Sequence, residues 1–217
     1  MSDNESKTNM GIMPMFASPL FVFPIENWSK HRKSILNLLP KIEPLNGIST
    51  DRTARGLKKE LPHYKDVVLG IVEEQLEEFS KVVWQSKGVA EVKETQIGIT
   101  EMWYRTDTAE AQYSLDNEGT VGWTAILYVD FDREIHYPTH FVAPMPRPDD
   151  GTIDKYEFPC DEGMLVIFPS SLAHMPGGMD PEENIKRTIV SFNMKTTPTD
   201  ILDTIIFDIE ENDNDTK

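Results

Sequence analysis

One histidine stands where its side chain could reach a metal ion or a substrate. His174 follows the apolar run 164–168, which predicts a buried strand, through a Pro-Ser-Ser turn, and it directly precedes Met-Pro-Gly-Gly. A histidine at a strand end beside a glycine-rich loop is well placed for an open site, and neutral imidazole is a common metal ligand. The alternative interpretation is an ordinary hydrogen-bonded histidine with no ligand role.

A second candidate feature is a polar strand face in the segment 187–193. Alternate side chains of a strand share a face, so Arg187, Ser191 and Asn193 point the same way. This face could line a polar cavity that binds an anion, and the alternative is a face that contacts water. The same alternation in 123–131 adds Tyr128 as a pocket residue, unless it is an amphipathic tyrosine of the core.

The elements that must position these side chains change character along the chain. Apolar periodicity predicts helices over 27–39 and 66–86 in the first half. Short β-branched or aromatic runs then predict strands over 97–104, 123–131, 139–143, 164–168 and 188–194, with 201–209 as one more candidate. We therefore expect an α+β chain with a mainly β core, in which a jelly roll carries N-terminal helices on one sheet.

Composition excludes several classes of protein. The 217 residues carry 37 acidic and 21 basic side chains, a net charge of −16, which disfavours a nucleic acid partner. No apolar run approaches the roughly 20 residues of a membrane span, and no secretion signal is evident. The single Cys160 excludes an internal disulfide and fits a cytoplasmic location.

We expect one domain over 10–207, between a disordered N-terminus, 1–9, and a disordered acidic tail, 208–217.

Two stretches resemble a known family. Residues 162–174, EGMLVIFPSSLAH, and then 186–193, KRTIVSFN, are similar to the C-terminal half of the Fe(II)/2-oxoglutarate-dependent oxygenases, above all to the small set carried by T4-like marine phages. The segment 122–132 is similar to the family's central strands. The resemblance implies a double-stranded β-helix fold. For a protein of phage origin it also implies a location in the cytoplasm of the host cell. It also implies a dioxygenase that hydroxylates its substrate and releases succinate and CO2 from 2-oxoglutarate.

The resemblance also assigns roles to individual residues. In this family Fe(II) is held by a His-x-Asp or His-x-His pair and by a distal histidine, which His174 matches. Arg187 matches the residue that binds the distal carboxylate of 2-oxoglutarate, where a planar two-pronged donor suits a carboxylate. Ser191 and Tyr128 would add hydrogen bonds to that carboxylate.

The proximal metal ligands depart from the family pattern, because the segment 111–119 contains no histidine. One registration places Ser114-Leu115-Asp116 over His-x-Asp. The other places Asp116 and Glu118 over His-x-His, so that these two carboxylates and His174 would form the site. Such an oxygen-rich site could hold Mn(II) as well as Fe(II). The alternative is that the segment forms a plain acidic turn.

Other readings of the same sequence stay open. His136 and His140 could substitute for the missing ligand, although Pro138 between them disfavours a helical metal site. A non-catalytic jelly-roll binding protein that has lost the iron site is one alternative to the oxygenase, and a cupin-like metal protein is another. No motif identifies a small-molecule or protein substrate, and none indicates an oligomeric state.

Overall fold

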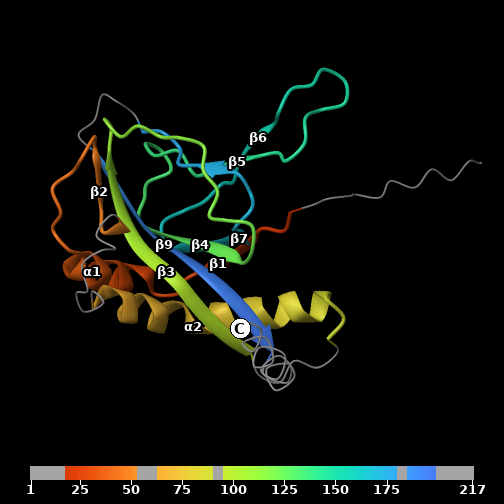
Figure 1. Ribbon diagram of the computed structural model, residues 1–217. Coiled ribbons are helices and arrows are strands. Elements are labelled where there is room, and N and C mark those ends of the chain that lie inside the picture. The colour runs from red at the N-terminus through yellow and green to blue at the C-terminus, as the bar shows by residue number, and fades with distance from the viewer. Residues whose placement is uncertain (1–17, 53–62, 90–94, 180–184, 199–217) are drawn as a thin grey trace, which may run out of the picture.

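The computed structural model describes residues 18–52, 63–89, 95–179 and 185–198 (Figure 1). The two predicted disordered ends, 1–9 and 208–217, and the candidate strand 201–209 lie outside these ranges. Among the described residues, no helix is long and apolar enough to span a membrane.

Both predicted helices are present. Helix α1 covers Trp28–Leu38 and helix α2 covers Tyr64–Ser86. Helix α2 buries one stripe of side chains, including Val68, Val72 and Phe79, because these positions recur with the period of an α-helix.

The larger sheet has six antiparallel strands. They are β1 (Phe21–Pro24), β2 (Ile48–Thr50), β3 (Thr95–Thr108), β4 (Trp123–Asp130), β7 (Met164–Pro169) and β9 (Lys186–Pro198). Their order across the sheet is β1-β7-β4-β9-β3-β2. Four of these strands were predicted, and the short edge strands β1 and β2 were not.

The smaller sheet is built from short strands. It contains β5 (His140–Val142), β6 (Lys155–Glu157) and β8 (His174–Met175), in the order β6-β5-β8. An isolated antiparallel bridge between Asp116 and His174 adds the segment before β4 to the other edge of β8. His174 therefore lies in a strand with neighbours on both sides.

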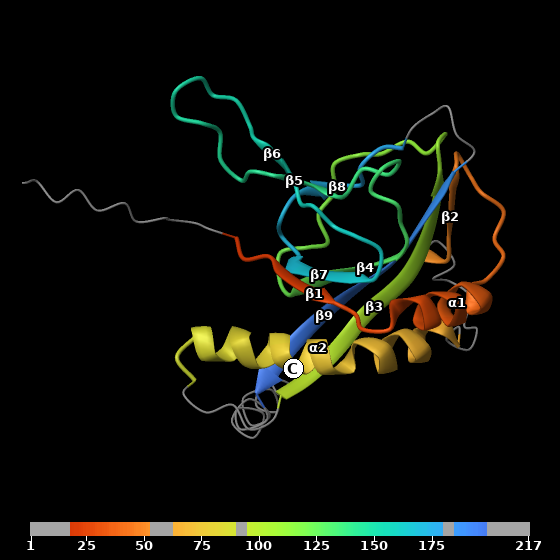
Figure 2. The ribbon, with the colours of Figure 1, turned by 180° about the vertical axis from the view of Figure 1, so that it is seen from behind.

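The two sheets and the helices form layers. Helices α1 and α2 lie against one face of the larger sheet, and the smaller sheet lies beyond its other face (Figures 1 and 2). One apolar cluster joins the helices to the larger sheet, and a second fills the space between the sheets around Ile126, Phe141 and Phe168. This arrangement confirms the predicted jelly roll with helices packed on one sheet.

Candidate functional site

The polar face of β9 points into the space between the two sheets. Arg187, Ser191 and Asn193 are only 2%, 4% and 9% exposed, so this face does not meet water. In the pairing of β4 with β9, Thr124 lies opposite Asn193 and Tyr128 lies opposite Ile189, which places Tyr128 on the same interior face. This face is therefore buried, contrary to the alternative in which it contacts water, and its role in binding an anion stays a prediction.

His174 is buried in β8 with one of its ring nitrogens fixed. Its Nδ1 lies 3.0 Å from the carbonyl oxygen of Leu172. Because a carbonyl only accepts, Nδ1 carries the hydrogen and Nε2 carries the lone pair of the neutral ring. Metal-ligating histidines commonly donate their second ring nitrogen to a backbone carbonyl in this way.

Asp116 lies directly opposite His174. Each residue donates its backbone N–H to the other's carbonyl at 2.9 Å. Directly opposed residues of an antiparallel pair have side chains on the same face, with Cβ atoms about 4.5–5.5 Å apart. The Asp116 side chain is exposed, and its Oδ1 accepts the N–H of Asn117 at 2.8 Å. The structure therefore brings Asp116 and His174 together.

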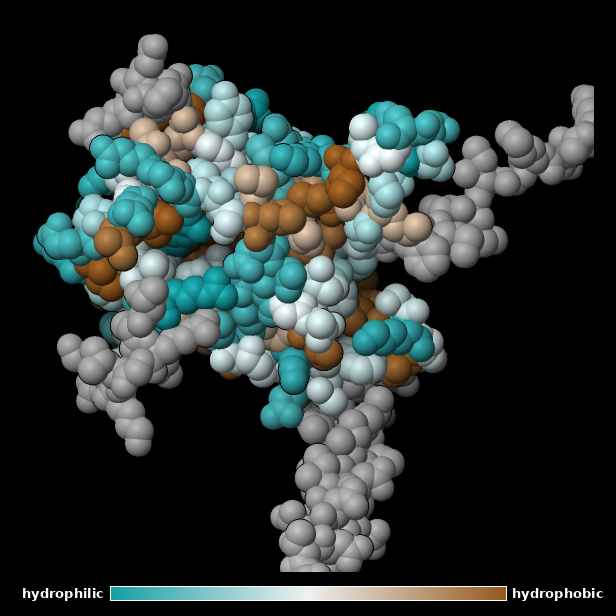
Figure 3. Space-filling view, turned by 45° about the horizontal axis from the view of Figure 1, so that its top comes forward, coloured by the Kyte–Doolittle hydropathy of each residue, from teal (hydrophilic) through white to brown (hydrophobic). Residues whose placement is uncertain are grey.

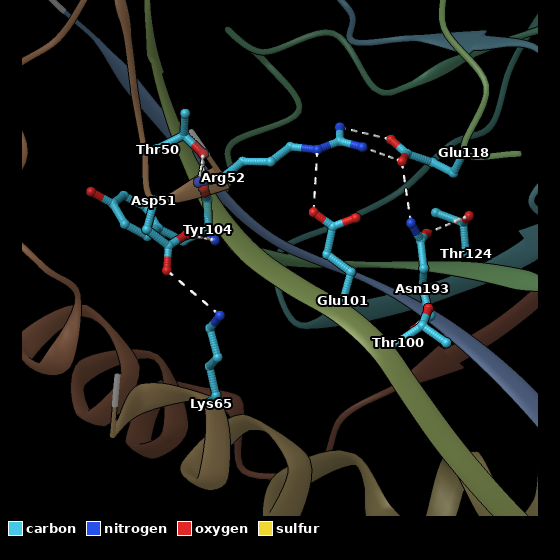
Figure 4. A network of polar contacts seen from close by, with 10 residues as sticks. All are labelled: Thr50, Asp51, Arg52, Lys65, Thr100, Glu101, Tyr104, Glu118, Thr124 and Asn193. Atoms are coloured by element: carbon cyan, nitrogen blue, oxygen red, sulfur yellow. Dashed lines mark hydrogen bonds and ion pairs between the residues drawn. The ribbon is translucent and has the colours of Figure 1, made fainter. Parts of the chain in front are cut away.

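Glu118 is held in a different set of contacts (Figure 4). Arg52 donates to both of its carboxylate oxygens, with 2.9 Å between Nη1 and Oε1. Asn193 donates through Nδ2 to Oε2 at 3.2 Å, and Thr124 donates to the Oδ1 of Asn193 at 2.9 Å. The Glu118 side chain is 5% exposed. Its carboxylate is thus already bound by a cation that belongs to the chain.

Arg52 reaches this position from the segment that follows β2. Its guanidinium lies 4.0 Å from the centre of the Trp103 ring, and its Nε lies 3.7 Å from Oε1 of Glu101. Figure 4 shows the neighbouring Asp51 pointing the opposite way, toward Lys65 on α2. The Asp51 side chain therefore points toward the helices, and the Arg52 side chain points into the jelly roll.

The metal-donor set is incomplete. In the described ranges, no group of three His, Cys, Asp or Glu side chains could hold a metal ion. The predicted ligands His174 and Asp116 lie opposite each other, but Ser114 offers only a hydroxyl, a poor ligand for Fe(II). The residues therefore do not fit a complete three-ligand iron site. The carboxylate-rich set that would favour Mn(II) is not formed either, because Arg52 binds Glu118.

Arg187 is buried and engaged by the protein. Its Nη2 donates to Oδ2 of Asp107 at 2.7 Å and to the Tyr113 hydroxyl at 3.3 Å. Its Nη1 donates to the carbonyls of Tyr137 and Gly177, at 2.9 and 2.7 Å. Its Nε is buried and has no hydrogen-bond partner among the described residues. Four of the five N–H groups of this guanidinium are therefore used.

Two further predicted binding residues line the same interior. Tyr128 is buried, donates to Oγ1 of Thr139 at 2.9 Å and accepts the Thr139 N–H at 3.3 Å. Burial is the main cause that raises the pKa of Tyr128, so its hydroxyl stays protonated. Ser191 lies between Ile126 of β4 and Trp103 of β3 in the strand register.

The other two candidate histidines occupy different places. Phe141 lies opposite His174 in the sheet, so the preceding His140 faces away, with Nε2 3.0 Å from Oε1 of Glu157. The Nδ1 of His136 accepts the N–H of Asp132 at 2.9 Å, so its hydrogen is on Nε2. That Nε2 is buried with no hydrogen-bond partner in the described part of the chain.

The burial of His136 predicts a pH dependence of stability. Desolvation, followed by the positive charge of Arg187, lowers the pKa of His136 below its ordinary 6.5. As the pH falls, His136 binds its proton at a higher pH in the unfolded chain than in the folded one. The stability that the neutral, buried His136 ring contributes is therefore present above about pH 6.5 and is lost progressively below it. We expect His136→Gln to reduce the loss of unfolding free energy between pH 7.5 and pH 5, measured by urea titration. His63→Gln is the exposed control, and equal losses in wild type and His136→Gln would contradict the prediction.

Sequence reasoning missed the charged residues of β3. Glu101, Trp103, Arg105 and Asp107 alternate along this strand and lie opposite Asn193, Ser191, Ile189 and Arg187 of β9. Asp107 is fully buried, and its Oδ1 accepts from Nε of Arg105 at 2.5 Å. The two-residue spacing of these charges was the available signal, because it is the same alternation that identified the polar face of β9.

An apolar groove of about 420 Å³ adjoins the interior. It is lined by residues that include Leu20, Phe141, Tyr156, Phe158 and Leu172. Phe141 and Leu172 also flank His174, so the groove and the histidine share a wall. On the face that carries the projecting β5–β6 segment, Figure 3 shows an elongated hydrophobic strip among hydrophilic residues.

The facing antiparallel sheets and the buttressing helices define a double-stranded β-helix, or jelly roll. One similar solved structure is SnoK, described as a non-heme alpha ketoglutarate dependent carbocyclase from nogalamycin biosynthesis, with a TM-score of 0.50 and 11% identity over 82% of this chain and 79% of SnoK. Another is AviO1 from Streptomyces viridochromogenes Tue57, with a TM-score of 0.51 and 11% identity over 84% of this chain and 91% of AviO1. No protein-family model and no curated protein matches the sequence. These likenesses are likenesses of fold.

Proposed function

We propose that this chain is an oxidoreductase of the 2-oxoglutarate-dependent oxygenase type that hydroxylates its substrate. The observation that supports the proposal is the pairing of Asp116 with His174, whose Nδ1 is tied to a carbonyl. An imidazole lone pair and a carboxylate on one face of a strand pair form a partial site for a divalent metal ion.

The chain's own residues have limited roles in this proposal. His174 and Asp116 would hold the metal ion, and Arg187 would bind a carboxylate of the co-substrate. A bound iron ion with 2-oxoglutarate would supply the oxidising chemistry, while the protein supplies orientation and a dry interior. Because only two protein ligands lie together among the described residues, we expect the affinity for metal to be weak.

Calorimetric titration tests this proposal. Wild type is titrated with 2-oxoglutarate in the presence and in the absence of Mn(II), a redox-stable probe of the metal site. We expect metal-dependent binding that His174→Ala weakens at least about tenfold. His63→Ala, which changes an exposed histidine outside the site, should bind as wild type does. Binding that ignores both the metal and His174 would exclude the oxygenase.

A non-catalytic jelly-roll binding protein is the second candidate. The observation that favours it is the engagement of Glu118 by Arg52, which leaves His174 and Asp116 as two metal donors instead of three in the described part of the chain. In that case a carboxylate ligand would bind equally well with and without Mn(II), and His174→Ala would change nothing in the titration.

A further inference from the structure

Asp107 bridges two arginines in the interior of the jelly roll. Its Oδ2 accepts from Nη2 of Arg187 at 2.7 Å, and its Oδ1 accepts from Nε of Arg105 at 2.5 Å. Asp107 is fully buried, and the side chain of Arg187 is 3% exposed. Two guanidinium groups and one carboxylate leave a net charge of +1 in this cluster, which suits one more anion.

Each arginine binds the Asp107 carboxylate through only one of the two N–H groups, those of Nε and Nη2, that lie along one edge of its guanidinium. Nε and Nη2 of an arginine form a planar fork that binds both oxygens of a carboxylate. In Arg105, Nε is bonded to Asp107 and Nη2 is buried without a hydrogen-bond partner among the described residues. In Arg187 the pattern is reversed, since Nη2 is bonded to Asp107 and Nε is the buried donor that no described residue accepts.

Tyr113 contacts both arginines. Its ring centre lies 5.1 Å from Cζ of Arg105 and 5.5 Å from Cζ of Arg187, and its hydroxyl accepts from Nη2 of Arg187 at 3.3 Å. Arg187 is also fixed through Nη1 by the carbonyls of Tyr137 and Gly177. The free donors, Nη2 of Arg105 and Nε of Arg187, therefore belong to side chains whose other contacts keep them in place.

We propose that Asp107 occupies the carboxylate-binding edge of Arg187 when no ligand is bound, and that a ligand carboxylate binds to Arg187 by displacing Asp107. In the exchange, Asp107 shifts onto the Nε and Nη2 fork of Arg105, and the ligand takes the Nε and Nη2 fork of Arg187. After the exchange, Nε and Nη2 of each arginine both donate to a carboxylate, with no covalent step and no change of protonation. The ligand class is a small carboxylate, and the inference rests on the proposed co-substrate role of Arg187.

The exchange gives Arg105 and Asp107 opposite roles in affinity. Asp107 competes with the ligand, whereas Arg105 receives Asp107 and so favours the ligand. The double variant Arg105→Gln/Asp107→Asn removes the competitor and keeps the cluster charge at +1. We expect it to bind 2-oxoglutarate about tenfold or more tightly than wild type. Arg105→Lys keeps the charge but lacks the fork, and we expect about tenfold weaker binding.

Calorimetric titration with 2-oxoglutarate, with and without Mn(II), decides between the outcomes, and circular dichroism checks folding. A second double variant, Arg105→Met/Asp107→Leu, guards against misfolding because apolar replacements of buried ion pairs are often tolerated. A folded double variant that binds no more tightly than wild type overturns the exchange. If wild type does not bind but a double variant does, Asp107 blocks Arg187 without yielding to the ligand, which overturns the exchange. Binding by neither overturns both.

Discussion

Replacing Gly177 with alanine is expected to lower the free energy of unfolding by about 2–3 kcal/mol. A Cβ at this position would lie 2.2 Å from the carbonyl oxygen of Pro138 and 2.4 Å from that of Tyr137. Both are backbone atoms, so a side-chain rotation cannot relieve the overlap and the paired loops must separate. The Gly177 carbonyl is also an acceptor of Arg187, so we expect carboxylate binding to weaken as well.

The adjacent Gly178 provides the matched control. A Cβ there would meet only the Cδ2 atom of Tyr137, at 3.8 Å, which is an ordinary contact. Urea denaturation of Gly177→Ala and Gly178→Ala therefore compares the same change one residue apart. Equal stabilities of the two variants would show that the loops of Tyr137 and Gly177 are not packed as described.

Replacing Arg52 with alanine is expected to cost about 2–4 kcal/mol of stability. The change leaves the Glu118 carboxylate, 5% exposed, without the cation that binds both of its oxygens. Breaking a buried pair from one side typically costs about 3–5 kcal/mol, and the cost here is reduced because Arg52 is 32% exposed. The stack on Trp103 is lost as well.

Two further variants give this prediction its control. Arg147→Ala breaks a more exposed pair with Asp154 and should cost clearly less stability than Arg52→Ala. Adding Glu118→Gln to Arg52→Ala removes the unpaired charge and should recover part of the lost stability. An Arg52→Ala variant as stable as Arg147→Ala, in thermal and urea unfolding, would mean that Glu118 is not bound as Figure 4 shows.

Alternation of side chains made much of the interior predictable. The period of two in β9 correctly placed Arg187, Ser191 and Asn193 on one face, because the register shifts in its pairings fall in the partner strands, at Ile99/Glu101 of β3 and at Tyr128/Asp130 of β4. The same rule placed Tyr128 on the interior face of β4. The apolar run of β7 and the glycine-rich turn marked the neighbourhood of His174, although its place in the short strand β8 was not foreseen.

The partners of these side chains were not predictable, because they depend on chain segments far apart in sequence. Arg52 and Glu118 are separated by 66 residues, and Arg187 and Asp107 by 80. Nothing local to Glu118 distinguishes a metal ligand from the partner of an arginine. Which role it takes depends on where the segment after β2 places Arg52, and that is a property of the assembled jelly roll.

The position of β9 as the last described strand has a consequence for folding during synthesis. It lies between β3 and β4, so the larger sheet stays divided until this strand is added. Until then the Asp107 carboxylate of β3 lacks Arg187, and Glu118 lacks Asn193. Long-range pairings of this kind slow folding. We therefore expect the growing chain to acquire its charged interior only after β9 has been made, with the helices already formed.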